Sequence, residues 1–171
     1  MQTMSTDPFE VLRLQYKPET IKILFIGESR PQNGTFFYKN NSNLSIFTHE
    51  ALILYRPDLF DSTDFLQSFK KYGCYLVDLC EQPVNGLTRT ERRNIHKLGE
   101  PNLKQTINEL NPDAIIVVIK GIRISVESVL AETANSSCPL FFLPFPALGH
   151  QHQYVDQLHK ALERLSQTGI I

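Results

Sequence analysis

Four short runs of apolar residues divide the chain, and each is predicted to form a β-strand. They cover residues 22–26, 75–79, 114–119 and 139–143. β-Branched and aromatic side chains dominate these runs, and turn-forming residues follow them. The third run, from Ala114 to Ile119, is the most hydrophobic segment of the chain, which is typical of a central parallel strand buried on both faces.

Around these runs, apolar residues recur at spacings of three and four, the period of amphipathic helices. A helix begins at Asp7–Pro8, and another ends at Arg56–Pro57. The capping-box spacing Thr88–Glu91 opens a short basic helix, and Pro101 starts the next one. The helices are predicted over residues 8–14, 44–55, 62–73 with Ser62 as the cap, 89–97, 101–110, 125–132 and 150–165.

Strands that alternate with helices predict the α/β class, here a doubly wound, four-stranded parallel sheet with helices on both faces. Such a chain is a three-layer α/β/α sandwich, and we expect residues 1–171 to form a single domain. In an open parallel sheet, the loops at the carboxyl ends of the strands form the ligand crevice. The segments that follow Ile26, Leu79, Ile119 and Leu143 are therefore expected to meet at one edge of the sheet.

Composition and charge change this picture little. The 171 residues carry a formal net charge of -1, with 42% hydrophobic and 20% charged residues, so no global charge attracts a polyanion. Cys74, Cys80 and Cys138 form no C-x-x-C pair, so we expect buried free thiols and no metal site. Without a membrane-length apolar segment or the apolar core of a signal peptide, we expect a cytoplasmic protein with no membrane partner.

The loop after the first strand is the most informative segment of the sequence. Gly27–Pro31 reads Gly-Glu-Ser-Arg-Pro, and a second glycine precedes the aromatic triplet Phe36–Tyr38. An apolar strand that ends in glycine, polar residues and aromatics is typical of a binding loop. An ordinary surface connection with an aromatic anchor fits the same pattern, so this segment alone leaves both interpretations open.

Together, the motifs at the ends of the predicted strands resemble those of the uracil-DNA glycosylase superfamily, from Ile23 to Leu165. Gly27–Pro31 stands in the place of the superfamily motif G-Q-D-P-Y or G-E-A-P-G. Asp78, in Leu-Val-Asp-Leu, stands where the superfamily has an asparagine that reads the uracil edge, and Leu143–Pro146 resembles the motif H-P-S-P. The resemblance implies a uracil-DNA glycosylase-like fold and a nucleobase as the ligand.

The resemblance also implies roles for individual residues. Such an enzyme flips a base out of the stack, holds it between apolar faces and reads its edge by hydrogen bonds. The implied base-binding residues are Gly27, Phe36, Phe37, Asp78 and Phe145. The implied phosphate-binding residues are Arg30, Lys39, Lys120, Arg123 and His152. The implied catalytic positions, with no cofactor, are Glu28, Ser29, Asp78 and His150.

Two departures from the superfamily pattern bear on catalysis. Ser29 stands where the best-known family has a water-activating aspartate, and Leu143 stands where it has the histidine that stabilises the leaving base. Glu28 or Asp78 is then the expected water-positioning group. At the start of the last helix, His150 or His152 is the expected replacement for the lost histidine.

The sequence leaves three functions open. The first is a base-excision hydrolase that acts as a monomer on the N-glycosidic bond of a damaged base in DNA. The second is a catalytically silent module that binds a free nucleobase or a nucleic acid, and the third is an unrelated small α/β hydrolase acting on a small molecule. The remaining histidines and the arginines of the basic helix are expected on the surface: His49, His96, His159, Arg89, Arg92 and Arg93.

Overall fold

The computed structural model describes residues 7–61 and 63–171 and contains a four-stranded, all-parallel sheet in the order β2-β1-β3-β4. All four predicted strands are confirmed, each within two residues of its predicted ends. They are β1 (Ile23–Gly27), β2 (Cys74–Asp78), β3 (Ala114–Val117) and β4 (Leu140–Phe142). The central strands β1 and β3 are completely buried, which explains why their apolar residues do not alternate with polar ones.

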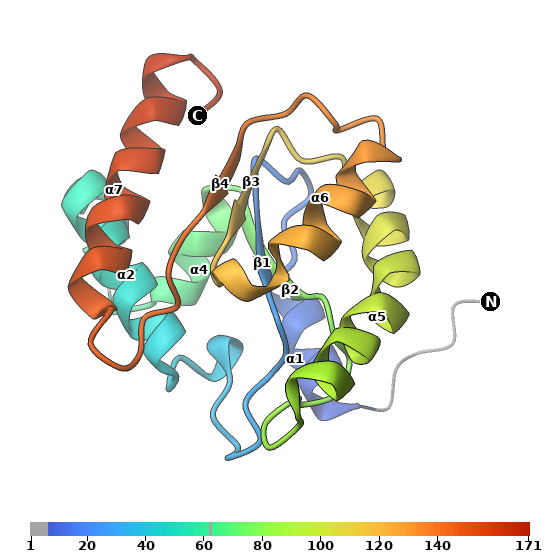
Figure 1. Cartoon of the computed structure of the whole chain (residues 1–171). Coiled ribbons are helices and arrows are strands. Elements are labelled where there is room, and N and C mark those ends of the chain that lie inside the picture. The colour runs from blue at the N-terminus through green and yellow to red at the C-terminus, as the bar shows by residue number, and fades with distance from the viewer. Residues whose placement is uncertain (1–6, 62) are drawn as a thin grey trace.

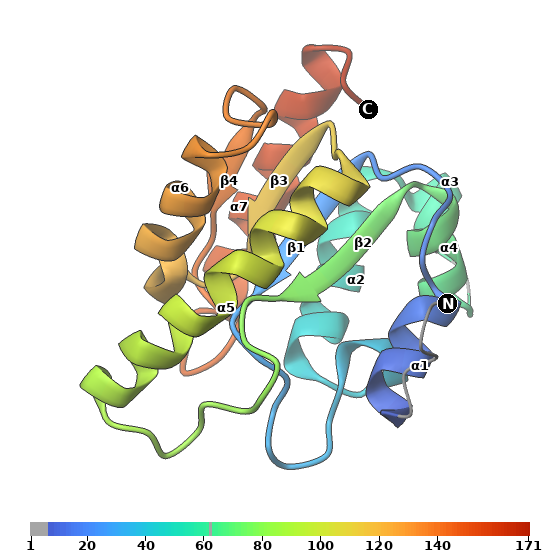
Figure 2. The same cartoon turned by 90° about the vertical axis from the view of Figure 1, so that its right-hand side faces the viewer.

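Helices cover both faces of the sheet, which gives the expected α/β/α layers (Figure 1, Figure 2). One face carries α2 (Asn43–Tyr55), α3 (Pro57–Phe60), α4 (Phe65–Lys71) and α7 (Gln151–Gln167). The other face carries α5 (Arg89–Leu110) and α6 (Arg123–Ala131). The remaining elements are α1 (Pro8–Gln15), near the carboxyl end of β2, and the 3-10 turns η1 (Phe37–Lys39) and η2 (Lys120–Ile122).

Local capping signals decide where several helices begin. The Asp7 side chain caps α1, and the capping box Thr88–Glu91 opens α5, both as predicted. The helix predicted from Ser62 begins at Phe65 instead, with the Asp64 side chain accepting a hydrogen bond from its first turn. Ser62 itself lies outside the described residues.

The prediction of two helices separated at Pro101 is wrong, because α5 runs through Pro101 without a break. A proline inside a helix removes one backbone hydrogen bond, here the one to the carbonyl of Lys97. Pro101 and Lys97 are both exposed, so the unpaired carbonyl lies on the solvent side of the helix. Burial of Leu103 and Ile107 on the opposite side keeps the helix continuous.

A tyrosine from the loop after β1 covers the outer edge of β2, which is an edge strand. The Tyr38 hydroxyl donates to the carbonyl of Leu76 (2.9 Å) and accepts from its N–H (2.7 Å). The Tyr38 ring is buried and stacks on Tyr16, the residue that follows α1. This arrangement satisfies backbone groups that an edge strand leaves unpaired and fixes the loop after β1 against β2.

The strand order creates a topological switch point beside β1. The chain leaves β1 for β2 on one side and later enters β3 on the other side. Ligands of open α/β sheets bind outside the carboxyl ends of the strands at such points. Because Gly27 pairs with Asp78, β1 and β2 end level with each other, and the residues that follow them enter the same region.

Candidate functional site

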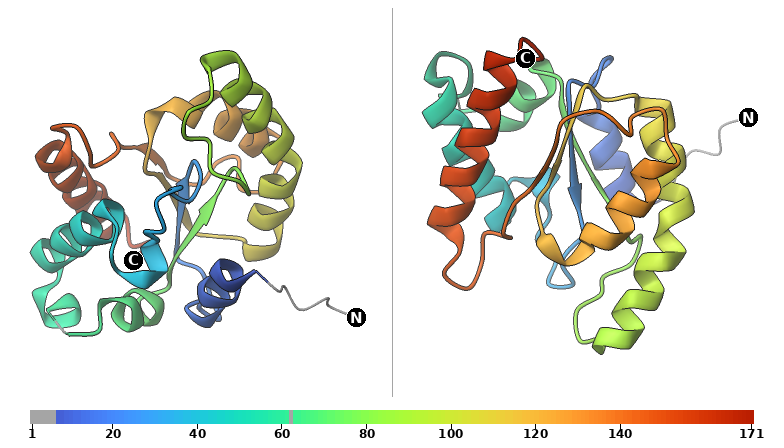
Figure 3. Two further views of the ribbon diagram at one scale, coloured as in Figure 1. Left: turned by 90° about the horizontal axis from the view of Figure 1, so that it is seen from below. Right: turned by 45° about the horizontal axis from the view of Figure 1, so that its top comes forward.

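A cleft of about 510 Å³ lies at the carboxyl edge of the sheet, beside the switch point. The left view of Figure 3 looks onto this end of the molecule, where the loops converge. The lining includes residues within 28–37 after β1, Val84 and Asn85 after β2, Ile119 after β3, and Phe145 and Leu148 after β4. The expectation that the four loops share one edge is confirmed.

This cleft brings together part of the predicted site. The predicted site residues that line it are Gly27, Glu28, Ser29, Arg30, Phe36, Phe37, Asp78 and Phe145. The predicted site residues that do not line it are Lys39, Lys120, Arg123, His150 and His152. Residues near the ends of β1 and β2 therefore dominate the cleft, and most of the predicted cations lie elsewhere.

The carboxylate of Glu28 is held by two groups of α5. Its Oε1 atom lies 2.7 Å from His96 Nε2, within hydrogen-bonding distance, and 3.1 Å from Arg92 Nε. The side chains of Glu28 and His96 are each only 10% exposed. The prediction that His96 lies on the surface is wrong, because His96 is buried. Arg92, which was predicted on a solvated helix face, has a side chain that is 42% exposed, and it also lines the cleft.

The sequence of α5 explains why these side chains face the sheet. Arg92, His96, Gly99 and Leu103 follow one another at spacings of four, three and four, so they share one side of the helix. Gly99 lies against the loop after β2, where an added Cβ atom would overlap the carbonyl oxygen of Leu79. The missing side chain at Gly99 lets α5 approach closely enough for His96 to contact Glu28. Leu103 and Ile107 form the apolar stripe of this helix. Continuing that stripe toward the N-terminus across Pro101 would have indicated that His96 faces the sheet.

Asp78 is the second carboxylate of the cleft, at the end of β2. Its Oδ2 accepts a hydrogen bond from the Arg13 guanidinium of α1 (3.2 Å), and the side chain is 10% exposed. A Cβ atom on Gly27 would lie 2.5 Å from Asp78 Oδ1, so the carboxyl group packs directly over that glycine. Burial raises the pKa of the Asp78 carboxyl above its usual value, and the positive charge of Arg13 opposes part of this shift.

Ser29 and Arg30 connect the motif to its surroundings. The Ser29 hydroxyl lies 3.4 Å from the N–H of Val84 and accepts a long hydrogen bond that ties together the loops after β1 and β2. The Arg30 guanidinium stacks over the ring of Phe9, 4.3 Å from its centroid, and its Nε is buried with no hydrogen-bond partner among the described residues. Arg30 also borders a second hollow of about 460 Å³ between α1 and α5, which shares the wall formed by Arg30 and Asp78.

The aromatic residues differ in how much ring surface they offer. Phe36 and Phe37 are only 1% and 3% exposed, because Phe36 packs edge-on against Phe9 and Phe37 packs against Phe69 in the core. Neither ring has a free face on which a planar group could stack. Phe145 is half-buried and lines the cleft, so it offers the accessible aromatic surface.

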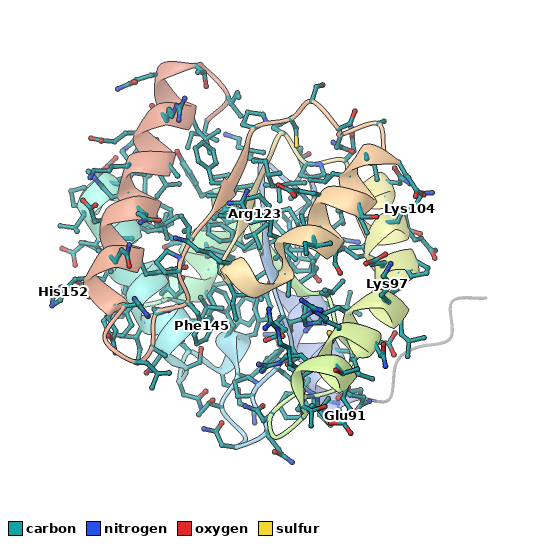
Figure 4. The ribbon with its side chains drawn as sticks, viewed as in Figure 1. Glu91, Lys97, Lys104, Arg123, Phe145 and His152 are labelled. Carbon is teal, nitrogen blue, oxygen red and sulfur yellow. The ribbon has the colours of Figure 1, made fainter. Side chains whose placement is uncertain are left out.

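Outside the cleft, the predicted cations have other partners or point into solvent. Arg123 stacks on the ring of Phe142 (4.0 Å) and pairs with Glu127. Figure 4 shows His152 on the outer side of α7, pointing away from Phe145. His150 occupies the N-cap position of α7, and its side chain contacts Gln153. Lys39 lies near the Phe9 ring, and Lys120 is exposed.

Leu148 was not predicted as a site residue, although it lines the cleft. Its side chain is 97% exposed, and its backbone has a positive φ of 52°, which is unusual for a leucine. The segment Pro146-Ala147-Leu148-Gly149 holds this apolar side chain out at the edge of the cleft. A lone leucine between a proline turn and a glycine is the only sequence signal for it.

Within the described part of the chain, no group of three or more His, Cys, Asp or Glu side chains is arranged to hold a metal ion. Cys74, Cys80 and Cys138 are free; the first two are buried and the third is half-buried, and burial raises the pKa of Cys80 to about 12. None of the helices in this part of the chain is long and apolar enough to cross a membrane.

Comparison with known proteins assigns no family to the chain. No protein-family model matches it, and a search of curated proteins finds no match. The chemistry of the cleft therefore has to carry any functional conclusion: two carboxylates at neighbouring strand ends, two arginines, one accessible aromatic ring and one exposed leucine.

Proposed function

We propose that this protein is a base-excision hydrolase of the uracil-DNA glycosylase type, which cleaves the N-glycosidic bond of a flipped base with Glu28 as the water-positioning carboxylate. The observation that carries the proposal is the position of Glu28. It stands in the motif that resembles the superfamily, follows β1 directly and lines the cleft at the switch point. His96 and Arg92 hold its carboxylate in one place.

The contacts of Glu28 leave one oxygen available for chemistry. His96 and Arg92 both approach Oε1, and Oε2 has no hydrogen-bond partner among the described residues. A fixed carboxylate in this place orients a water molecule and stabilises positive charge that develops on the sugar as the bond breaks. Ser29 has no carboxylate and holds the neighbouring loop, so we assign it no catalytic role.

The remaining lining residues support a flipped base as the guest. Base flipping needs a pocket with an apolar face, which Phe145 supplies. Proteins that distort the duplex insert an exposed apolar side chain between base steps, and Leu148 has the exposure and position for this role. Arg30 and Arg92 are the cations at the cleft, so they replace His150 as the groups that stabilise a departing base anion.

The test is strand cleavage by alkali after incubation with oligonucleotides that carry uracil, hypoxanthine or xanthine in single or double strands. We expect abasic sites with the wild-type protein and a loss of about 100-fold or more in Glu28→Gln, the usual size of acid–base contributions. Glu163→Gln, on the exposed side of α7, is the matched control and is expected to keep wild-type activity. His150→Ala is also expected to remain active. Equal activity of Glu28→Gln and wild type would refute the role of Glu28.

A catalytically silent binding module is the second candidate. It is favoured by the pairing of both carboxylates with cations and by the position of His150 outside the cleft, which leaves no histidine at the leaving base. Binding of the oligonucleotides without strand breaks would support this candidate. A steep loss of that binding as salt is added would show that phosphate contacts contribute to it.

A further inference from the structure

The two carboxylates present the guest with hydrogen-bond acceptors. Asp78 Oδ2 is occupied by Arg13, whereas Asp78 Oδ1 has no hydrogen-bond partner among residues 7–61 and 63–171. Glu28 Oε2 is in the same situation. An ionised carboxylate accepts hydrogen bonds and donates none. The part of the cleft between the ends of β1 and β2 is therefore an acceptor surface.

An acceptor surface distinguishes between the pairing edges of the bases. The edge of uracil has one N–H between two carbonyl oxygens, so a carboxylate against it gains one hydrogen bond and opposes an oxygen. The edge of guanine has two neighbouring donors, the ring N1–H and the exocyclic 2-amino group. A carboxylate oxygen has about two lone-pair directions, so Asp78 Oδ1, the oxygen that Arg13 does not occupy, can accept from both donors.

The other polar groups of the cleft fit the rest of a guanine edge. Guanine has a carbonyl oxygen, O6, next to N1, and it needs a donor. Arg30 lines the cleft beside Asp78, and its guanidinium carries N–H donors. The cleft volume of about 510 Å³ is in the range of small-molecule sites and has room for a purine nucleotide.

From these observations we propose that Asp78 is the specificity-determining residue and that the cleft selects guanine, or a damaged guanine that keeps the N1–H and 2-amino donors. This inference rests on the proposed function only in placing a base in the cleft. Gly27 is required because a side chain there would displace the Asp78 oxygen that faces the guest.

The experiment compares two labelled single-stranded oligonucleotides that consist of thymidine except at the central position. One carries guanine there, and the other carries hypoxanthine, which lacks only the 2-amino group. Binding to the full chain is measured by fluorescence anisotropy. We expect the guanine strand to bind about 10- to 100-fold more tightly, the effect of one hydrogen bond to a charged group. Equal binding, tighter binding of hypoxanthine, or no binding of either strand would overturn the inference.

Two variants test whether Asp78 causes the preference. Asp78→Asn exchanges one acceptor for a donor, and we expect it to reduce the preference for guanine to less than about 3-fold, whereas the exposed Asp113→Asn keeps it. Gly27→Ala is expected to weaken the preference by displacing the same carboxyl group. If Asp78→Asn does not fold, the wild-type preference together with Gly27→Ala decides the inference.

Failure of this inference can be told apart from failure of the proposed function. Cleavage of uracil strands without any preference for guanine would leave the hydrolase standing and remove the assignment of Asp78. A preference for guanine without cleavage of any strand would support Asp78 and favour the silent binding module.

Discussion

Gly99 is the point at which α5 touches the loop after β2, and replacing it with alanine tests the packing that positions His96. An added Cβ atom would overlap the Leu79 carbonyl oxygen and lie 3.0 Å from its carbonyl carbon. That backbone cannot yield easily, because the Leu79 N–H is bonded to the carbonyl of Gly27 (2.9 Å). Either α5 or the end of the β1–β2 ladder must move.

Two opposing effects set the magnitude of the Gly99→Ala change. Alanine is favoured over glycine inside a helix by about 1 kcal/mol. Overpacking a close contact typically costs about 1–3 kcal/mol, and a clash with fixed backbone belongs at the upper end. We therefore expect a net loss of about 2 kcal/mol in the free energy of unfolding, which lowers Tm by about 4–8 °C for a chain of this size.

Urea and thermal unfolding, followed by circular dichroism, measure this loss. The matched control is Gly121→Ala in η2, where an added Cβ meets nothing within 4 Å. That control is expected to unfold within about 1 kcal/mol of wild type, on the stabilising side. If Gly99→Ala is as stable as wild type or more stable, the gain in helix propensity outweighs the clash. The close contact between α5 and the Leu79 backbone would then be refuted.

Two further substitutions probe the groups around the carboxyl edge. Tyr38→Phe leaves both backbone groups of Leu76 without their buried partner, so we expect it to lower the free energy of unfolding, measured with urea, by about 2–3 kcal/mol. The control Tyr154→Phe breaks one hydroxyl contact and is expected to lower it by about 1 kcal/mol. Equal losses would refute this reasoning. Arg13→Met removes the partner of Asp78 and is expected to cost about 3 kcal/mol at pH 7. Because the folded-state pKa of Asp78 is raised above its unfolded value, its ionisation destabilises the fold. This deficit should therefore shrink as the pH is lowered and Asp78 is protonated, and a deficit that grows would contradict this reasoning.

The strands and most helix boundaries could be read from the sequence because their signals are local. A buried parallel strand needs a continuous apolar run, and each of the four runs became a strand. The capping residues Asp7 and Thr88 satisfy backbone groups in their own first turn, so they need no tertiary context. The convergence of the loops followed from the topology of parallel sheets alone.

The errors in the candidate site share one cause, which is tertiary packing. Pro101 has a local cost, but the packing of Leu103 and Ile107 outweighs it, and the resulting long helix carries His96 into the site. The aromatic pair Phe36 and Phe37 was expected to offer stacking faces, but neighbouring aromatics cover both rings. No local pattern could indicate this, because the covering side chains come from α1 and α4.

The cations show most clearly why sequence proximity to a strand end is a weak guide. Lys120 and Arg123 follow β3 directly, yet η2 and the start of α6 carry them away from the cleft. Arg92 and Arg13 lie far from any strand end in sequence, and the folded chain brings both to the carboxylates. A helix has a charged side chain available at every turn, so packing decides which of them reaches the site.

The placement of these cations explains how two acids can share one cleft. Glu28 follows β1, and Asp78 is the last residue of β2. These neighbouring strands end level with each other, and neighbouring strands of a sheet are only about 4.8 Å apart. Two unpaired carboxylates so close and so buried would repel each other strongly. Each is instead neutralised from behind, Glu28 by α5 and Asp78 by α1, through only one of its oxygens. The remaining oxygens stay available to a guest because the compensating charges come from helices outside the sheet.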